Sequence, residues 1–250
     1  MEYDVRVNGI QVTARYSQRA IDEIFLPLLR RLTALQREKG RRILALLAAP
    51  PGCGKTTLAG FLETLSRTRG EVSPVQAIGM DGFHRRQEYL KSHVAQRDGK
   101  PVPMVDIKGA PITFDLPRRT DAVKRVAAGE TCGWPAYDRL LHDPVENALQ
   151  VDESIVLLEG NYLLLNEAGW RDLSPLADYT VSITADENLL RARLIDRKIK
   201  TGVAPDQAVR FVDFSDMPNV RLCLEKTARA DLPLRVDAAG DFFLQEITGQ

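Results

Sequence analysis

The chain has 250 residues, 44% hydrophobic and 27% charged, which is enough apolar content for one large α/β domain or two small ones. Its 34 Lys and Arg balance 34 Asp and Glu, so no global positive field favours nucleic acid or an anionic membrane surface as a partner. No segment resembles a signal peptide or a membrane span, and the three cysteines are widely spaced. We therefore expect a cytoplasmic protein with reduced thiols and no cysteine metal site.

The first forty residues read as an N-terminal extension. Residues 3–16 alternate β-forming side chains around Asn8-Gly9, which is typical of a two-residue hairpin turn. From Ser17 the apolar residues follow helical spacing to about Gly40, with Pro27 at a kink or early turn. The residues leave two roles open for this extension, covering a sheet edge or forming a homodimer contact.

Residues 41–250 alternate strands with helices and predict a single domain. The pattern predicts buried strands over 43–48, 75–80, 154–158 and 178–183, helices over 55–69, 117–128 and 187–228, and a terminal hairpin over 232–236 and 241–247. The long segment 91–116 is expected to be a functional loop or lid. This order predicts an α/β fold with a mostly parallel sheet, helices on both faces and ligands beyond the carboxyl ends of the strands.

The strongest motif is a phosphate-binding loop over residues 49–56. It fits the spacing G-x-x-x-x-G-K-[ST], except that Ala49 stands where the first Gly is usual. Gly52 and Gly54 let backbone N–H groups turn towards phosphate oxygens at a helix N-terminus. Lys55 supplies a charge for the β and γ phosphates, and Thr56 supplies an Mg²⁺ ligand. We predict a P-loop NTPase fold with a site for ATP or GTP, bound by Pro51, Gly52, Cys53, Gly54, Lys55, Thr56 and Thr57.

Two acids follow predicted strands and complete a site for phosphoryl transfer. Asp81 ends the second strand, where it could accept a proton from an attacking hydroxyl, although Asp-Gly is also a common turn dipeptide. Glu159 ends the third strand, where a carboxylate can hold Mg²⁺ beside Thr56, although acids often end strands without such a role. Since parallel strands end at one sheet edge, we predict Asp81 as base and Glu159 as metal ligand.

Two further segments carry candidate ligand contacts. Residues 135–139 and His142 combine aromatic and hydrogen-bonding groups, which suits a polar-ligand pocket, although His142 could equally lie on a surface loop. A basic cluster precedes Thr201-Gly202 and could close over the phosphates as a lid near residues 190–220, although such runs often form a solvated helix face; it consists of Arg191, Arg193, Arg197, Lys198 and Lys200. We select Arg197 as the catalytic cation of this cluster.

These motifs resemble the P-loop kinases that include uridine kinase, phosphoribulokinase and bacterial pantothenate kinase, over roughly residues 43–230. Residues 108–115 (KGAPITFD) and 159–162 (EGNY) are most similar to a bacterial subgroup labelled as candidate nucleoside or fructose-transport kinases. The resemblance implies that Asp81 is the catalytic base and that Asp115 binds substrate hydroxyls. It further implies that Tyr137 and His142 contact the substrate and that the region of Arg197 closes over ATP.

Two residues depart from the uridine kinase pattern within this resemblance. His84, which we expect to contact substrate, stands where uridine kinases carry Tyr, and Arg139 stands where they carry Phe. Both changes weaken the case for a nucleoside acceptor.

Together the motifs predict an ATP-dependent kinase that transfers the γ-phosphate of MgATP to a hydroxyl of a sugar, nucleoside or pantothenate-like molecule. The main alternative is a P-loop ATPase that acts as a nucleotide-driven switch or accessory protein. A nucleotide-binding scaffold without activity is the third reading, and intact Lys55, Thr56, Asp81 and Glu159 argue against it.

Overall fold

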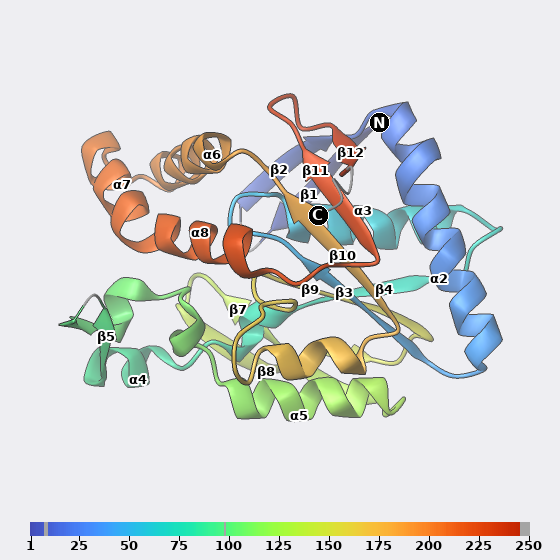
Figure 1. Cartoon of the computed structure of the whole chain (residues 1–250), viewed down its shortest axis with the longest axis horizontal. Helices are drawn as coiled ribbons and strands as arrows, with labels where there is room; N and C mark the ends of the chain where they lie inside the picture. Colours follow the sequence, from blue (N-terminus) through green and yellow to red (C-terminus); the bar gives the residue numbers. More distant parts are fainter. Residues whose placement is uncertain (8–9, 98, 246–250) are drawn as a thin grey trace.

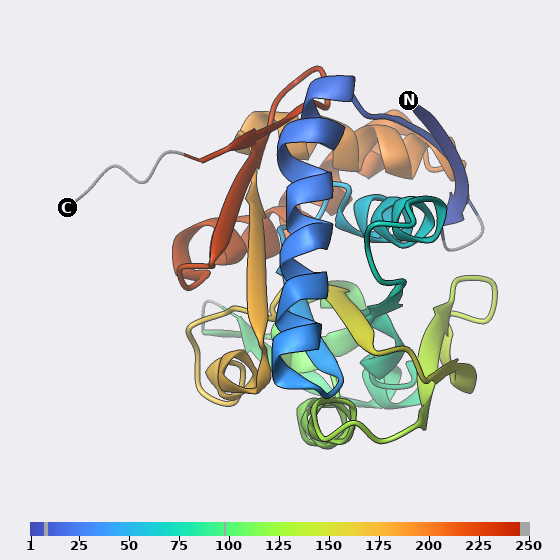
Figure 2. The ribbon, with the colours of Figure 1, turned by 90° about the vertical axis from the view of Figure 1, so that its right-hand side faces the viewer.

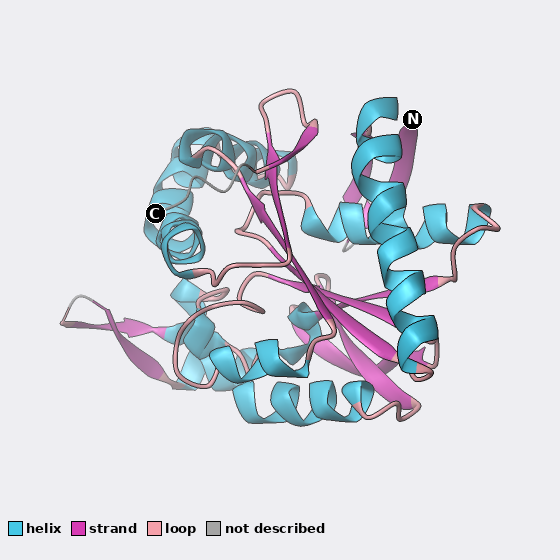
Figure 3. Cartoon of the chain, turned by 45° about the vertical axis from the view of Figure 1, so that its right-hand side comes forward, coloured by secondary structure: helices cyan, strands magenta, loops and turns pink. Residues whose placement is uncertain are grey.

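The computed structural model of the protein describes residues 1–7, 10–97 and 99–245. Its centre is a six-stranded sheet with the spatial order β12 (Phe242–Leu244), β11 (Leu232–Val236), β10 (Tyr179–Thr184), β3 (Ile43–Ala48), β9 (Ile155–Gly160) and β4 (Val75–Gly79). Neighbouring strands run parallel except for β11 and β12. The predicted parallel sheet is therefore confirmed, and the predicted terminal hairpin forms its edge as far as residue 245. Figure 3 shows helices on both sides of this twisted sheet.

The central strand β3 divides the interior into two hydrophobic cores. Its odd-numbered residues face one core and its even-numbered residues face the other, because successive side chains of a strand point to opposite faces. The first core lies under α2 (Leu26–Lys39) and α3 (Lys55–Thr68), and the second lies under α5 (Leu116–Ala127). Burial on both faces explains why this strand reads as a continuous apolar run.

The N-terminal extension forms the predicted hairpin and helix. Strands β1 (Glu2–Val7) and β2 (Ile10–Arg15) pair antiparallel, while the Asn8-Gly9 turn lies outside the described residues. The helix begins as α1 (Gln18–Ala20), passes through a π-helical turn (Ile21–Phe25) and continues as α2, where Pro27 occupies the first turn. Gly40 ends it with a left-handed φ of 60°.

The hairpin packs beside α3 and does not pair with either edge strand of the central sheet (Figure 2). Tyr3 lies edge-on to Phe61 of α3, with ring centroids 5.5 Å apart. Tyr16, at the end of β2, stacks on the same ring at 4.2 Å. As far as the structure describes it, the hairpin forms a separate two-stranded sheet, and Tyr3 and Tyr16 attach it to α3.

Two antiparallel hairpins lie where the sequence pattern indicated loops. The segment 91–116 contains β5 (Val94–Arg97) and β6 (Lys100–Pro103), followed by 3₁₀ turns at Met104–Ile107 and Pro111–Thr113. A longer hairpin joins β7 (Cys132–Asp138) to β8 (Asp143–Val151). The segment expected to be a functional loop or lid thus contains a small hairpin, and its residues Val105, Lys108 and Gly109 line the large cavity described below. Helix α4 (Gln87–Ser92) precedes the first hairpin.

The predicted helical region after β10 is confirmed. It consists of α6 (Glu187–Lys200), α7 (Pro205–Phe211), a π-helical turn (Val212–Asp216) and α8 (Met217–Lys226), and these form one end of the molecule in Figure 1. A 3₁₀ segment, Arg171–Leu176, precedes β10. Within the ranges that the structure describes, no helix is long and apolar enough to cross a membrane.

Candidate active site

The phosphate-binding loop connects β3 to α3, as the sequence predicts. Gly52 and Gly54 have φ angles of 86° and 83°, values that side chains other than Gly rarely adopt. Gly54 is the N-cap of α3, so the free backbone N–H groups of the first helical turn point out of the helix where Lys55 begins. A Cβ at Gly52 would lie 3.3 Å from the carbonyl oxygen of Leu190, which shows how closely α6 approaches the loop.

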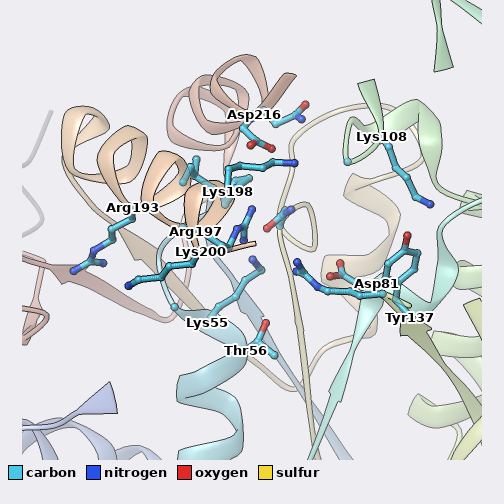
Figure 4. A pocket seen from close by; sticks show the side chains of 18 of the residues that line it. Lys55, Thr56, Asp81, Lys108, Tyr137, Arg193, Arg197, Lys198, Lys200 and Asp216 are labelled. Carbon is cyan, nitrogen blue, oxygen red and sulfur yellow. The ribbon is translucent and has the colours of Figure 1, made fainter. Parts of the chain in front are cut away.

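A cavity of about 670 Å³ opens at this loop and unites most of the predicted site residues. The predicted residues that line it are Pro51, Gly52, Gly54, Lys55, Thr56, Thr57, Asp81, His84, Tyr137, His142 and Arg197. Figure 4 shows Lys55 between the basic side chains of α6 on one side and Asp81, Tyr137 and Lys108 on the other. The P-loop therefore lies at the centre of the cavity, with a separate group of residues on each side.

Thr56 and Glu159 form the pair expected at a magnesium site. The Thr56 hydroxyl donates a hydrogen bond of 2.9 Å to Glu159 Oε1. Glu159 is buried at the end of β9, and burial raises the pKa of its carboxyl to about 7, while the Lys55 ammonium opposes that rise. A nearby divalent cation stabilises the ionised form of a carboxylate that burial has stripped of water. The Thr56 hydroxyl and the Glu159 carboxylate therefore fit Mg²⁺ bound together with nucleotide phosphates.

Asp81 lies in the 3₁₀ turn Met80–Phe83 that directly follows β4. His84 comes next, and its ring stacks on Phe114 at 3.9 Å and meets the edge of Tyr137 at 5.5 Å. Burial lowers the pKa of His84 to about 4, although the Asp81 carboxylate opposes the shift. The imidazole is therefore neutral at physiological pH, and its buried Nδ1 has no hydrogen-bond partner among the described residues.

On the other side of the cavity, Arg197 projects from α6 and is largely enclosed. Burial lowers the pKa of its guanidinium, and the carboxylates of Asp216 and Asp81 oppose that shift. Asp81 acts on Arg197 electrostatically, so the predicted base and the predicted catalytic cation face the same space. Lys200, from the same basic cluster, also lines the cavity and forms a 2.7 Å ion pair with Asp196, in which both side chains are exposed.

Three predicted residues do not line this cavity: Glu159, which reaches it through Thr56, and two residues with other surroundings. Asp115 does not line the described cavity; it is the N-cap of α5, and its carboxylate accepts a 3.3 Å hydrogen bond from the backbone N–H of Arg118. Cys53 is not among the residues that line this cavity; its thiol is buried in the first core, and burial raises its pKa to about 12. All three cysteines are free and buried.

Several further polar residues line the cavity, and of these the sequence indicated only Arg139, as part of segment 135–139 and without a role of its own. The Lys108 ammonium lies 4.7 Å from the centre of the Tyr137 ring and donates a 2.9 Å hydrogen bond to Gln87 Oε1. Arg139, Asn161 and Asp216 each carry a buried polar atom without a hydrogen-bond partner in the described chain. These residues come from separate loops and a π-helical turn, so no local spacing in the sequence connects them with the P-loop.

Known proteins resemble the chain over most of its length. A family model described as "Phosphoribulokinase / Uridine kinase family" matches residues 44–233. The uncharacterized protein YggC of Escherichia coli (strain K12) is 38% identical over 243 residues, which cover 97% of this chain and 98% of that protein. A candidate uridine kinase of Schizosaccharomyces pombe is 31% identical over 202 residues, which cover 78% of this chain and 83% of that protein.

A crystal structure supports the same relationship. The candidate fructose transport system kinase from Silicibacter sp. TM1040 is 29% identical in sequence and superposes with a TM-score of 0.70. The superposition covers 81% of this chain and 98% of the other. With the family match over residues 44–233 and the P-loop geometry described above, the chain belongs to the phosphoribulokinase / uridine kinase family of P-loop kinases.

Proposed function

We propose that the protein transfers the γ-phosphate of MgATP to a hydroxyl group of a small molecule, namely a sugar, a nucleoside or a pantothenate-like compound. The observation that carries this proposal is the presence of Asp81 in the same cavity as Lys55 and Thr56. A kinase needs a carboxylate near the terminal phosphate to accept the proton of the attacking hydroxyl.

Each group of residues has a separate task in this proposal. Asp81 accepts the proton of the acceptor hydroxyl as its oxygen attacks phosphorus. Lys55 and Arg197 stabilise the negative charge on the transferred group, since both are cations in a partly enclosed space. Thr56 and Glu159 hold Mg²⁺, which would neutralise charge on the β and γ phosphates.

The helices α6–α8 are proposed to act as the lid predicted near residues 190–220. Leu190 and Leu194 of α6 already touch the space beside Gly52, and Arg197 and Lys198 of the same helix line the cavity. A small inward movement of α6 would bring these cations onto the phosphates and exclude water, which limits hydrolysis of ATP.

The cavity has room and chemistry for an acceptor next to the phosphates. Beyond Asp81 its wall contains the neutral ring of His84 together with Tyr137, Lys108 and His142. A nucleotide switch requires only a site for water at this position. A wall of hydrogen-bonding and aromatic groups therefore favours a substrate over water as the phosphate acceptor.

The test is ADP release with MgATP against a panel of ketoses, aldoses, polyols, nucleosides and pantothenate. One compound should raise turnover at least about a hundredfold above basal hydrolysis. Asp81→Asn should abolish that increase and leave ATP binding, measured by calorimetry, nearly unchanged. Low hydrolysis that is uniform across the panel and equal in the variant would instead favour a switch ATPase.

A further inference from the structure

A second cavity of about 550 Å³ lies beside the P-loop, on the side where the N-terminal hairpin packs. Its lining comes from the P-loop and α3, strand β2, α6 and the connection between β11 and β12. The residues that line both this cavity and the larger one are Val12, Thr13, Gly52, Gly54, Thr57 and Arg193. The two spaces therefore meet at the P-loop, and a ligand bound there can extend from one into the other.

The P-loop fixes which part of a nucleotide points towards this second cavity. The terminal phosphate belongs near Lys55 and Thr56, because Glu159 and Asp81 lie on that side. Thr57, one residue further along α3, lies on the border of the second cavity, whereas Asp81 lines only the first. A triphosphate that runs from Asp81 past Thr56 to Thr57 places its ribose and base in the second cavity.

Hydrogen bonds connect the walls of this second cavity. Arg193 of α6 donates a 3.2 Å hydrogen bond to the carbonyl oxygen of Asp237, in the β11–β12 connection. Arg19 donates a 2.9 Å hydrogen bond to Asp241 in the same connection, and the Ser17 hydroxyl donates one of 2.7 Å. The hairpin is held on the opposite side by the stacking of Tyr16 on α3. These contacts hold the β11–β12 connection to α6 and to the start of the N-terminal helix, and hold the end of β2 to α3.

The lining of this space suits a flat heterocycle. Val12 and Ala14 are half-buried side chains on the same side of β2 and form an apolar wall, next to Tyr16, which is itself buried against Phe61. Val236, Ala239 and Phe242 contribute apolar surface from the β11–β12 region. Nucleobases bind between apolar surfaces because their faces are poorly hydrated. The nearby guanidinium of Arg193 can donate hydrogen bonds to the phosphates.

We infer that the N-terminal hairpin is part of the nucleotide site, with the β2 segment Val12–Ala14 forming the wall against which the ribose and base of the nucleoside triphosphate lie. This inference rests on the proposed function for the identity of the ligand. The hairpin lies outside residues 44–233, which match the family model, so the wall is an addition of the N-terminal extension to the kinase domain.

Val12→Trp tests the wall, because the larger ring fills space that the inference assigns to the nucleoside. We expect the variant to bind ATP at least about tenfold more weakly in calorimetric titrations with Mg²⁺. Its affinity for inorganic tripolyphosphate, which has no ribose or base, should change less than twofold. The control is Glu38→Trp, an exposed position of α2 that lines neither cavity and should leave both affinities unchanged.

Two outcomes would overturn the inference. Equal loss of ATP and tripolyphosphate binding would mean that the hairpin merely supports the P-loop, and no loss of either would mean that the nucleoside lies elsewhere. Hydrogen exchange on the wild-type protein gives an independent answer that requires no variant. Backbone amides of residues 12–14 should exchange more slowly with bound ATP than with bound tripolyphosphate.

These measurements separate the inference from the kinase proposal. They record binding alone and need no acceptor, so a selective loss of ATP affinity would stand even if the acceptor panel found no substrate. In the opposite case, an active kinase whose Val12→Trp variant binds ATP normally would leave the proposed function intact and remove the hairpin from the nucleotide site.

Discussion

Gly82 determines how closely strand β7 approaches the residue that we propose as catalytic base. A Cβ added at Gly82 would lie only 2.1 Å from the carbonyl oxygen of Pro135 and 2.9 Å from the backbone nitrogen of Ala136. Both are backbone atoms of β7, which cannot rotate away as a side chain would. The absence of a side chain at Gly82 thus allows β7 to bring Tyr137 up to Asp81 and His84.

Gly82→Ala should therefore move β7 and damage the acceptor side of the cavity. We expect a loss of about 1–3 kcal/mol in the free energy of unfolding, typical of overpacking, together with a higher KM for the acceptor. Urea denaturation measures the first effect. Gly70→Ala is the matched control, because its Cβ would meet nothing within 4 Å, and it should change stability by less than about 0.5 kcal/mol.

The raised pKa of Glu159 predicts how nucleotide binding depends on pH. Only the ionised carboxylate can hold Mg²⁺, and burial raises this pKa to about 7 in the protein without nucleotide. MgATP binding should therefore release a proton below pH 7 and should weaken between pH 8 and pH 6. Since the terminal phosphate of ATP also titrates in this range, Glu159→Gln provides the reference. Calorimetry in buffers of different ionisation enthalpy measures the released proton, and equal release by both proteins would contradict the assignment.

The same pKa shift predicts an effect on stability with a defined sign. The folded protein binds this proton more tightly than the unfolded chain, whose Glu has the ordinary value of 4.5. The contribution to stability is thus complete below about pH 4.5 and is lost as pH rises through about 7. At pH 8, Glu159→Gln should raise the free energy of unfolding of the nucleotide-free protein by on the order of 1–3 kcal/mol, and its melting temperature should rise accordingly. At pH 5 both increases should be much smaller. An equal effect at both pH values would show that burial of charge is not the cause.

Among the elements after residue 40, strands buried along their whole length could be predicted from sequence, whereas two hairpins with few buried side chains could not. Strands β3 and β9 are buried along their whole length and therefore appear as continuous apolar runs. Most of β8 is exposed or half-buried, and β7 contains Pro135 and a register shift, so neither shows a clear alternation. The β5–β6 hairpin was not predicted either, because it contributes few side chains to a core and so has no clear apolar pattern.

The predicted site shows a similar division. P-loop residues could be found because their chemistry requires a fixed local spacing, and the two strand-end acids followed from the parallel sheet. Arg139 and Asp216 reach the cavity from elements far apart in the chain, and only tertiary structure brings them together. The assignment of roles to Asp81, Glu159 and Arg197 stays a prediction for the variants described here.

Helix α6 offers a direct comparison between two of its arginines. Arg197 faces the cavity and lies within electrostatic reach of Asp81, whereas Arg191 forms an exposed ion pair of 2.6 Å with Asp213. Arg197→Met should lower kcat about a hundredfold or more, because it removes a cation that acts on developing charge. Arg191→Met should change kcat less than twofold, since an exposed ion pair contributes little. Steady-state kinetics measure kcat for both variants. Similar losses of kcat in the two would indicate a general effect of substitution on α6 and not a catalytic role of Arg197.

At the scale of the whole molecule, the N-terminal helix shares its core with the kinase domain. Phe25 lies edge-on to Phe61 of α3 at 6.0 Å and to Phe242 of β12 at 5.4 Å. This cluster joins the beginning, middle and end of the chain in the first core. Residues 1–40 and 41–250 are therefore expected to unfold as one cooperative unit, although only the second segment carries the P-loop.

Phe25→Ala tests this cooperativity, because both tryptophans of the protein lie in the second core, on the opposite face of the sheet. Loss of the buried ring should cost about 3–5 kcal/mol. If the chain is one unit, the unfolding midpoint reported by the fluorescence of Trp134 and Trp170 should fall by the same amount as the midpoint from far-ultraviolet circular dichroism. A fluorescence midpoint that stays at the wild-type value would show that the extension unfolds separately. In that case its hairpin could leave the P-loop without loss of the kinase fold, and a fixed nucleoside wall would not be expected.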